Sequence, residues 1–167
     1  ELGARGTLVL PLAAPGALQY EVGLFNTTNR DDILFQTTGR STGLFANVDK
    51  TRRRGFEGKV LGSAGALSWM IAYSHIKATF EADFNALSPN HDFADGEGEI
   101  AISKGDSIPG IPEQQFKLVA DYALTPRWQL GLDMLANSGQ TLRGDESNQL
   151  APTAGYAILN LRTRYAY

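Results

Sequence analysis

The chain has 167 residues, 43% of them hydrophobic, and a formal net charge of −3 from 15 basic and 18 acidic residues. This length supports one domain, and the nearly balanced charge offers no basic surface for nucleic acid, so we expect no nucleic-acid partner. The chain has no cysteine and only two histidines, which excludes Cys-ligated metal sites and thiol nucleophiles and leaves little for histidine centres. We therefore predict that the protein is not an enzyme and needs no cofactor or metal.

An alternation of apolar and polar side chains with a period of two predicts about seven strands and no helix. It is clearest in residues 128–134, where Trp, Leu, Leu and Met share one parity and Gln, Gly and Asp share the other. In residues 48–61 and 69–80 the alternation is interrupted, so the face on which each side chain lies is not settled there. In chain order, the predicted strands lie within 2–10, 20–24, 48–61, 69–80, 116–122, 128–134 and 157–167.

The lengths of the strands and of their connections favour a membrane-spanning sheet. Several strands exceed the roughly 5–6 residues that are usual in soluble sheets, and no apolar run reaches the roughly 20 residues of a transmembrane helix. The connections 11–17, 62–66 and 124–127 are short, whereas 36–44, 85–113 and 139–154 are long. Short turns on one rim and long loops on the other are typical of outer-membrane barrels. We expect an all-β fold, an antiparallel up-and-down meander of about seven long strands that is part of a transmembrane β-barrel.

Aromatic residues follow the short turns. Tyr20, Trp69 and Trp128 each lie within a few residues of such a turn. Aromatic girdles occur at the membrane interfaces of β-barrels, but aromatic side chains that fill the ends of a soluble core would give the same pattern. The two interpretations stay open at this point.

Four stretches of the sequence resemble the TonB-dependent outer-membrane receptors. In residues 47–58, Asn-Val-Asp-Lys-Thr-Arg-Arg-Arg-Gly-Phe-Glu-Gly, the Asn, the Thr-Arg pair and the Gly-aromatic-Glu step are similar to a barrel strand that descends from an extracellular loop. Residues 29–34, 108–113 and 155–161 are similar to other strand ends of this family, in the same order. The resemblance extends over essentially the whole chain.

The resemblance implies a plugged 22-stranded barrel in the outer membrane of a Gram-negative bacterium, energised by the TonB system. Its ligand would be a scarce molecule, most often a ferric siderophore and otherwise a cobalamin, haem or glycan. Since 22 strands need several times this chain, we expect residues 1–167 to be a partial barrel segment without plug domain or closing strand, with TonB contacted through parts outside it. The isolated segment is expected to self-associate through its open strand edges. Two alternatives remain, a small passive porin-like barrel and a soluble all-β ligand-binding domain.

The two longest loops carry the candidate ligand-binding residues, because long loops on a rigid wall commonly perform recognition. Oxygen ligands at alternating positions could also bind Ca²⁺, but the spacing does not match an EF-hand loop, and acidic residues in a Gly-containing loop are usually just solvated. The candidates are His91, Asp92, Asp95, Glu97 and Glu99 in the first loop, and Arg143 and Asp145 in the second.

Polar residues on the strands are candidates for the lumen of the barrel or for its outer rim. Lys50, Arg52 and Arg54 share their parity with Phe56, so if Phe56 faces lipid they lie where the phosphates of lipopolysaccharide could bind. Weak ion pairs with neighbouring strands are the alternative. The predicted lumen-lining residues are Arg53, Asp133, Asn160, Arg162 and Arg164.

Overall fold

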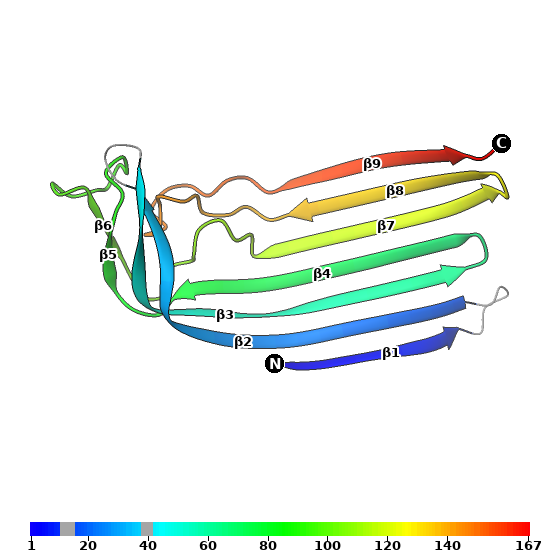
Figure 1. Ribbon diagram of the computed structural model, residues 1–167, viewed down its shortest axis with the longest axis horizontal. Helices are drawn as coiled ribbons and strands as arrows, with labels where there is room; N and C mark the ends of the chain where they lie inside the picture. The colour runs from blue at the N-terminus through cyan, green and yellow to red at the C-terminus, as the bar shows by residue number, and fades with distance from the viewer. Residues whose placement is uncertain (11–15, 38–41) are drawn as a thin grey trace.

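Seven long strands form one antiparallel sheet in the computed structural model, which describes residues 1–10, 16–37 and 42–167 (Figure 1). Their order in the sheet is β1-β2-β3-β4-β7-β8-β9, so each long strand lies beside the next one along the chain. The predicted all-β meander of seven strands is therefore confirmed. The strands are β1 (Leu2–Leu10), β2 (Gly16–Thr37), β3 (Gly43–Ala64), β4 (Leu67–Phe80), β7 (Gln114–Thr125), β8 (Trp128–Asn137) and β9 (Tyr156–Tyr165).

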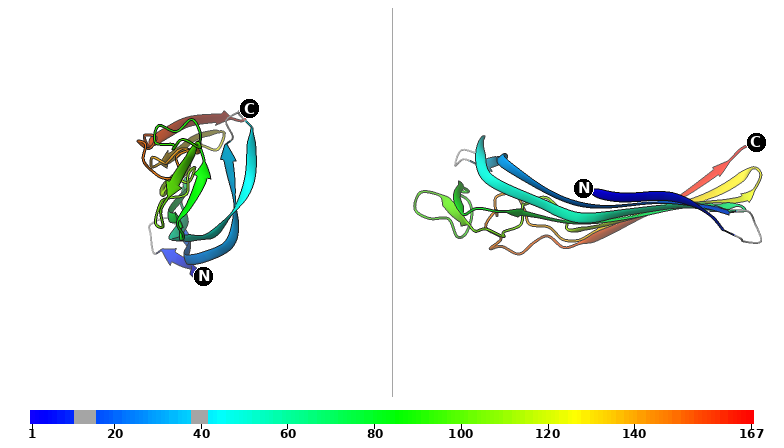
Figure 2. Two further views of the ribbon diagram at one scale, coloured as in Figure 1. Left: turned by 90° about the vertical axis from the view of Figure 1, so that its left-hand side faces the viewer. Right: turned by 90° about the horizontal axis from the view of Figure 1, so that it is seen from below.

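β2 and β3 are longer than the sequence pattern predicts, at 22 residues each. They continue past the apolar part of the sheet and curve upward at the end where the long loops gather (Figure 2). The prediction ended β2 at residue 24 because polar residues replace the apolar alternation between Asn26 and Asp32. Part of the predicted loop 36–44 is strand, while residues 38–41 and residues 11–15 of the predicted turn 11–17 lie outside the described part of the chain.

The predicted loop 85–113 contains a second, two-stranded sheet, which corrects the expectation of an uninterrupted loop. β5 (Phe84–Leu87) pairs with β6 (Glu99–Ile102) in an antiparallel register. Four-residue strands inside a polar, Gly-containing segment give too little alternation to be recognised from the sequence.

A small core packs this second sheet against β3 and β4. Its buried residues are Val48, Phe80, Ala86, Ile100 and Ile102. Within the described residues, every buried apolar side chain belongs to this loop end, and the rest of the large sheet is a single thin layer (Figure 2). A soluble sandwich would bury one face of its sheet along the full strand length, and this sheet does not. The described residues also contain no helix long and apolar enough to cross a membrane.

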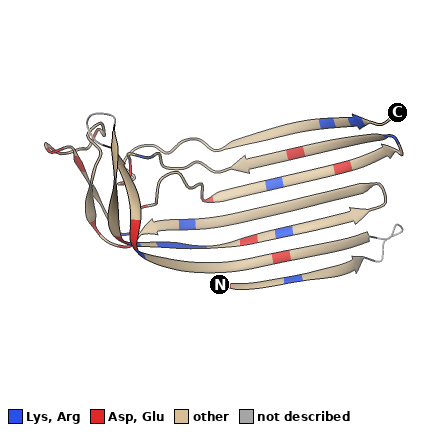
Figure 3. Cartoon of the chain, in the orientation of Figure 1, with Lys and Arg blue, Asp and Glu red and all other residues tan. Residues whose placement is uncertain are grey.

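The strand register aligns the apolar side chains of all seven strands on one face of the sheet and the polar side chains on the other. Leu24 pairs with Phe56, so the interrupted alternation of β3 is resolved, and Lys77 of β4 falls on the apolar side while Ile76 falls on the polar side. Charged residues are sparse along the strands away from the loop end (Figure 3). The apolar face carries Leu8, Leu18, Val22, Leu24, Phe56, Val60, Trp69, Ile71, Tyr73, Phe116, Leu118, Tyr122, Leu130, Leu132, Met134, Leu159 and Leu161.

The aromatic residues near the short turns all lie on the apolar face. The Trp69 ring covers Gly62 of the neighbouring strand so closely that a Cβ there would lie 2.3 Å from it. The Trp128 indole Nε1 donates to the Thr163 hydroxyl of β9 at 2.7 Å. Trp128 is the first residue of β8, and an indole with a hydrogen-bonded N–H at a strand end suits a membrane–water interface.

Candidate functional site

A charged cluster on the polar face joins β7, β8 and β9. Arg162 of β9 donates from Nε to Asp133 of β8 at 2.5 Å, and its Nη2 lies 3.4 Å from a carboxylate oxygen of Asp121 of β7. Gly131 is the register partner of both Asp121 and Arg162. A Cβ at Gly131 would lie 2.9 Å from the guanidinium carbon, so this glycine leaves the space through which Arg162 reaches β7.

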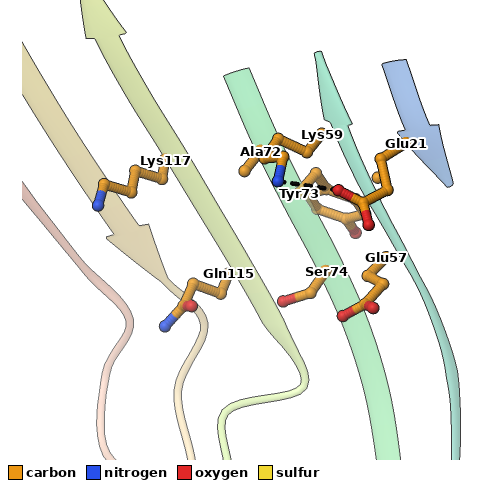
Figure 4. A pocket seen from close by; sticks show the side chains of 9 residues that line it. Glu21, Glu57, Lys59, Ala72, Tyr73, Ser74, Gln115 and Lys117 are labelled. Carbon is orange, nitrogen blue, oxygen red and sulfur yellow. Dashed lines mark ion pairs between the residues drawn. The ribbon is translucent and has the colours of Figure 1, made fainter. Parts of the chain in front are cut away.

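The same face has a hollow of about 320 Å³ between β2, β3, β4 and β7 (Figure 4). A 2.9 Å ion pair between Glu21 and Lys59 lies at its side. Glu57 and Lys117 line the hollow as well, and neither makes an ion pair within the described residues. The hollow can bind cationic as well as anionic groups, since carboxylate, ammonium, hydroxyl and amide groups all border it.

Arg53 lies on the polar face near the loop end. It donates to Asp32 at 2.9 Å and to the Thr51 hydroxyl at 3.1 Å, and Thr51 in turn donates to Asp32 at 2.5 Å. Asp31, the residue before Asp32, has a φ of 52°. This value lies in the left-handed region of backbone conformation, which Asp tolerates better than most residues. Arg53 thus forms an ion pair with the neighbouring strand β2, which is the alternative that the sequence analysis left open.

A buried hydrogen bond connects the two longest loops. His91 Nε2 lies 2.9 Å from Asp145 Oδ1, and the two side chains are 1% and 3% exposed. Asp145 also accepts the backbone N–H groups of Gln149 and Leu150, and His91 Nδ1 accepts the N–H of Phe93. Because Nδ1 accepts, Nε2 carries the proton and donates it to the carboxylate. The structure brings these two predicted residues together, but they bind each other and are buried, so neither side chain is presented to a ligand.

The remaining loop candidates lie near the surface. Asp92, Asp95, Glu97 and Arg143 are exposed and Glu99 is half-buried. Asp95 accepts the backbone N–H groups of Glu99 and Glu97, both at 2.9 Å, and these hydrogen bonds hold its pKa below the ordinary value of 3.8. Its carboxylate closes a local turn and does not converge with its neighbours: among the described residues, no group of three or more acidic or histidine side chains could hold a metal ion.

The sequence prediction missed several residues of the polar face. Asp121 and Lys117 could have been included, because the alternation in residues 116–122 already places them opposite Phe116 and Leu118. Glu21, Glu57 and Lys59 become neighbours only through the pairing of β2 with β3. No periodicity within a single strand predicts which residues face each other across two strands.

The comparison with protein families accounts for this separation of faces. All 167 residues match the family described as the TonB dependent receptor-like β-barrel. The chain belongs to this family. The chain is therefore a segment of an outer-membrane receptor barrel and not an enzyme.

Solved structures give the same fold. The receptor barrel is similar to the siderophore receptor PiuA from Acinetobacter baumannii, with a TM-score of 0.64 and 18% identity over 90% of this chain. It is also similar to the ferric-catecholate import receptor Fiu from E. coli K12, with a TM-score of 0.56 and 20% identity over 91% of this chain. In both cases the chain spans 21% of the matched structure. No curated protein matches the chain significantly.

Proposed function

We propose that residues 1–167 form part of the wall of a longer receptor barrel that takes up a scarce ligand, most readily a ferric siderophore. The observation that carries this proposal is the separation of one apolar and one polar face over seven antiparallel strands in a member of this family. The similarity to two receptors whose titles name a siderophore and a ferric catecholate supports the ligand class. TonB supplies the energy through parts of the receptor outside this chain.

The polar face lines the lumen in this proposal, and it carries charges of both signs. Arg53, Asp133, Asn160, Arg162 and Arg164 all share this face. Arg162 is held between Asp121 and Asp133, so the cluster rigidifies the wall and leaves little free charge to trap a passing anion.

The loop residues form the mouth of the barrel. The His91–Asp145 pair fastens the loop between β4 and β7 to the loop between β8 and β9. The two loops then move as one unit and present Asp92, Glu97 and Arg143 outward. We propose that this unit is the first contact for the ligand and that the buried pair sets its shape.

Uptake in cells tests this function. The full-length receptor that contains this segment is expressed in a Gram-negative strain lacking its own siderophore receptors, and ⁵⁵Fe uptake is measured with a panel of ferric siderophores. We expect uptake that disappears when TonB is deleted. Uptake that persists without TonB would favour the passive porin-like alternative, and no uptake of any iron complex would refute the ligand class.

A further inference from the structure

The loop between β4 and β7 packs against the polar face of the wall. The register places Ala78 opposite Arg53 and Phe80 opposite Thr51, so both apolar residues share the face that carries Arg53. They are nevertheless only 4% and 1% exposed. Phe84 of β5 packs edge-on against Phe80, with ring centroids 5.2 Å apart, and the apolar cluster continues with Ala86, Ile100 and Ile102. The two-stranded sheet therefore covers the loop end of β4 on its polar side.

The outer part of the β2–β3 hairpin belongs to the same packed unit. Val48 and Thr51 are three residues apart on β3, yet both are buried, so the alternation of faces shifts by one residue between them. Beyond this shift, Val48 lies in the apolar cluster and Leu34 of β2 packs against it. Gln36, further along β2, accepts the backbone N–H of Leu87 in β5 through its side-chain oxygen at 3.4 Å. The outer hairpin therefore packs on the two-stranded sheet (Figure 2).

Polar contacts join the loop between β8 and β9 to this unit, in addition to the buried histidine–carboxylate pair. The Ser88 hydroxyl donates to the carbonyl of Gly144 at 2.6 Å. The Asn148 side chain accepts the backbone N–H of Ser107 at 2.6 Å and donates to its carbonyl at 3.0 Å, so it pairs with Ser107 as a neighbouring strand would. Over the described part of the chain, no buried side-chain nitrogen or oxygen lacks a hydrogen-bond partner. Separating the loops would break these bonds together and leave buried polar groups unpaired, which disfavours opening.

We propose that the two loops and the outer hairpin, residues 32–37, 43–48, 81–113 and 138–155, form one prefolded constriction, which we name the loop unit. The loop unit covers the inner side of the wall at β4 and keeps a single closed conformation while the ligand enters. The ligand passes beside it, and the entrance is opened by loops outside residues 1–167. Segments that open easily bury few apolar contacts and expose their hydrogen bonds, whereas the loop unit buries both. The inference rests on the proposed function, in which the polar face lines the lumen.

Spin-label distances in the full-length receptor, reconstituted in phospholipid nanodiscs, test this proposal. Residues 1–167 contain no cysteine, and cysteines elsewhere in the receptor are replaced by serine. Pairs of labels at the exposed residues Asn47, Lys104 and Leu142 report the three distances between the hairpin and the two loops. A pair at Leu8 and Leu130, which are exposed on the apolar face of the sheet, gives the width expected of a rigid wall. Double electron–electron resonance measures each distance distribution with and without the ferric complex of a tris-catecholate siderophore.

The variant H91A/N148A removes polar contacts between the two loops, and E97A is its matched control because it changes an exposed carboxylate of the same loop. We expect the three distributions of the parent to be as narrow as that of the wall pair, with no shift when the ferric complex binds. H91A/N148A should broaden the Lys104–Leu142 distribution, and E97A should leave it narrow. Heat-modifiable migration in gel electrophoresis establishes that each barrel is folded.

The outcomes separate this proposal from the proposed function. A second distance population in the parent, or a shift of any of the three distances on binding, would overturn the closed loop unit even if the receptor takes up iron. An unchanged distribution in H91A/N148A would overturn the role of the polar contacts. If no ferric complex binds, the ligand class fails, while narrow distances in the ligand-free receptor still support the closed loop unit.

Discussion

Replacing Ala120 by Arg places a charge at the centre of the apolar face. β7 has 12 residues, and Ala120 lies at its middle, in register with Trp69 of β4 and Leu132 of β8. At about 3.4 Å per residue and a tilt of roughly 40°, β7 spans about 31 Å along the membrane normal and covers an apolar band of about 25 Å. Position 120 is therefore near the midplane, where an outward arginine costs about 2–4 kcal/mol.

The adjacent residue provides a matched control at the same depth. Val119 points to the polar face, where its register partners are Met70 and Asp133. Arginine there meets water and a carboxylate, so Val119→Arg should cost less than about 1 kcal/mol. The free energy of unfolding of the full-length receptor, folded into phospholipid vesicles and titrated with denaturant, measures both changes. Equal costs for the two variants would refute the face assignment.

Three further predictions concern the loops and the sheet edges. His91→Ala removes the 2.9 Å donor to the buried Asp145, so opening of the two long loops should become easier by about 1–3 kcal/mol. Faster hydrogen exchange would report this opening, whereas the exposed Asp92→Ala should leave exchange unchanged. The turn at Asp95 is stabilised above pH 3.8, and because the folded-state pKa is lower, this stabilisation is lost as the pH falls through the lowered value. Exchange at residues 97–99, corrected for intrinsic rates, should rise there, and Asp95→Asn should remove the pH dependence. The isolated chain leaves β1 and β9 as open edges, so light scattering should find it associated, and a monodisperse monomer in water would contradict this.

The sequence predicts the meander well because most of the long strands show an apolar–polar alternation of their own. In 116–122, 128–134 and 157–165 the alternation alone assigns the faces, and the register between the strands agrees with it. The prediction fails where tertiary contacts decide. Asn26–Asp32 is strand despite its polar composition because β3 pairs with every residue of it except Asp31.

The sequence predicts on which face of the sheet the residues of the candidate site lie, but it does not predict which of them contact each other. The sequence indicates that Asp133 and Arg162 share a side, but the bridge from Arg162 to Asp121 depends on the absent side chain of Gly131 between them. His91 and Asp145 are 54 residues apart, and both were expected to meet a ligand. Their burial against each other follows from the packing of two irregular loops, and irregular loops show no sequence periodicity from which such packing could be predicted.

The most direct test of the account is an accessibility scan along residues 115–122 of β7 in the full-length receptor in membranes. The segment contains no cysteine, so single cysteines introduced there can each carry a nitroxide spin label without a second site in the segment. We predict that labels at 116, 118, 120 and 122 collide with dissolved oxygen, which concentrates in lipid, and that labels at 115, 117, 119 and 121 collide with a water-soluble nickel complex. Two curves with a period of two and opposite phase would support the membrane-wall account. Curves in phase, or no period, would contradict it.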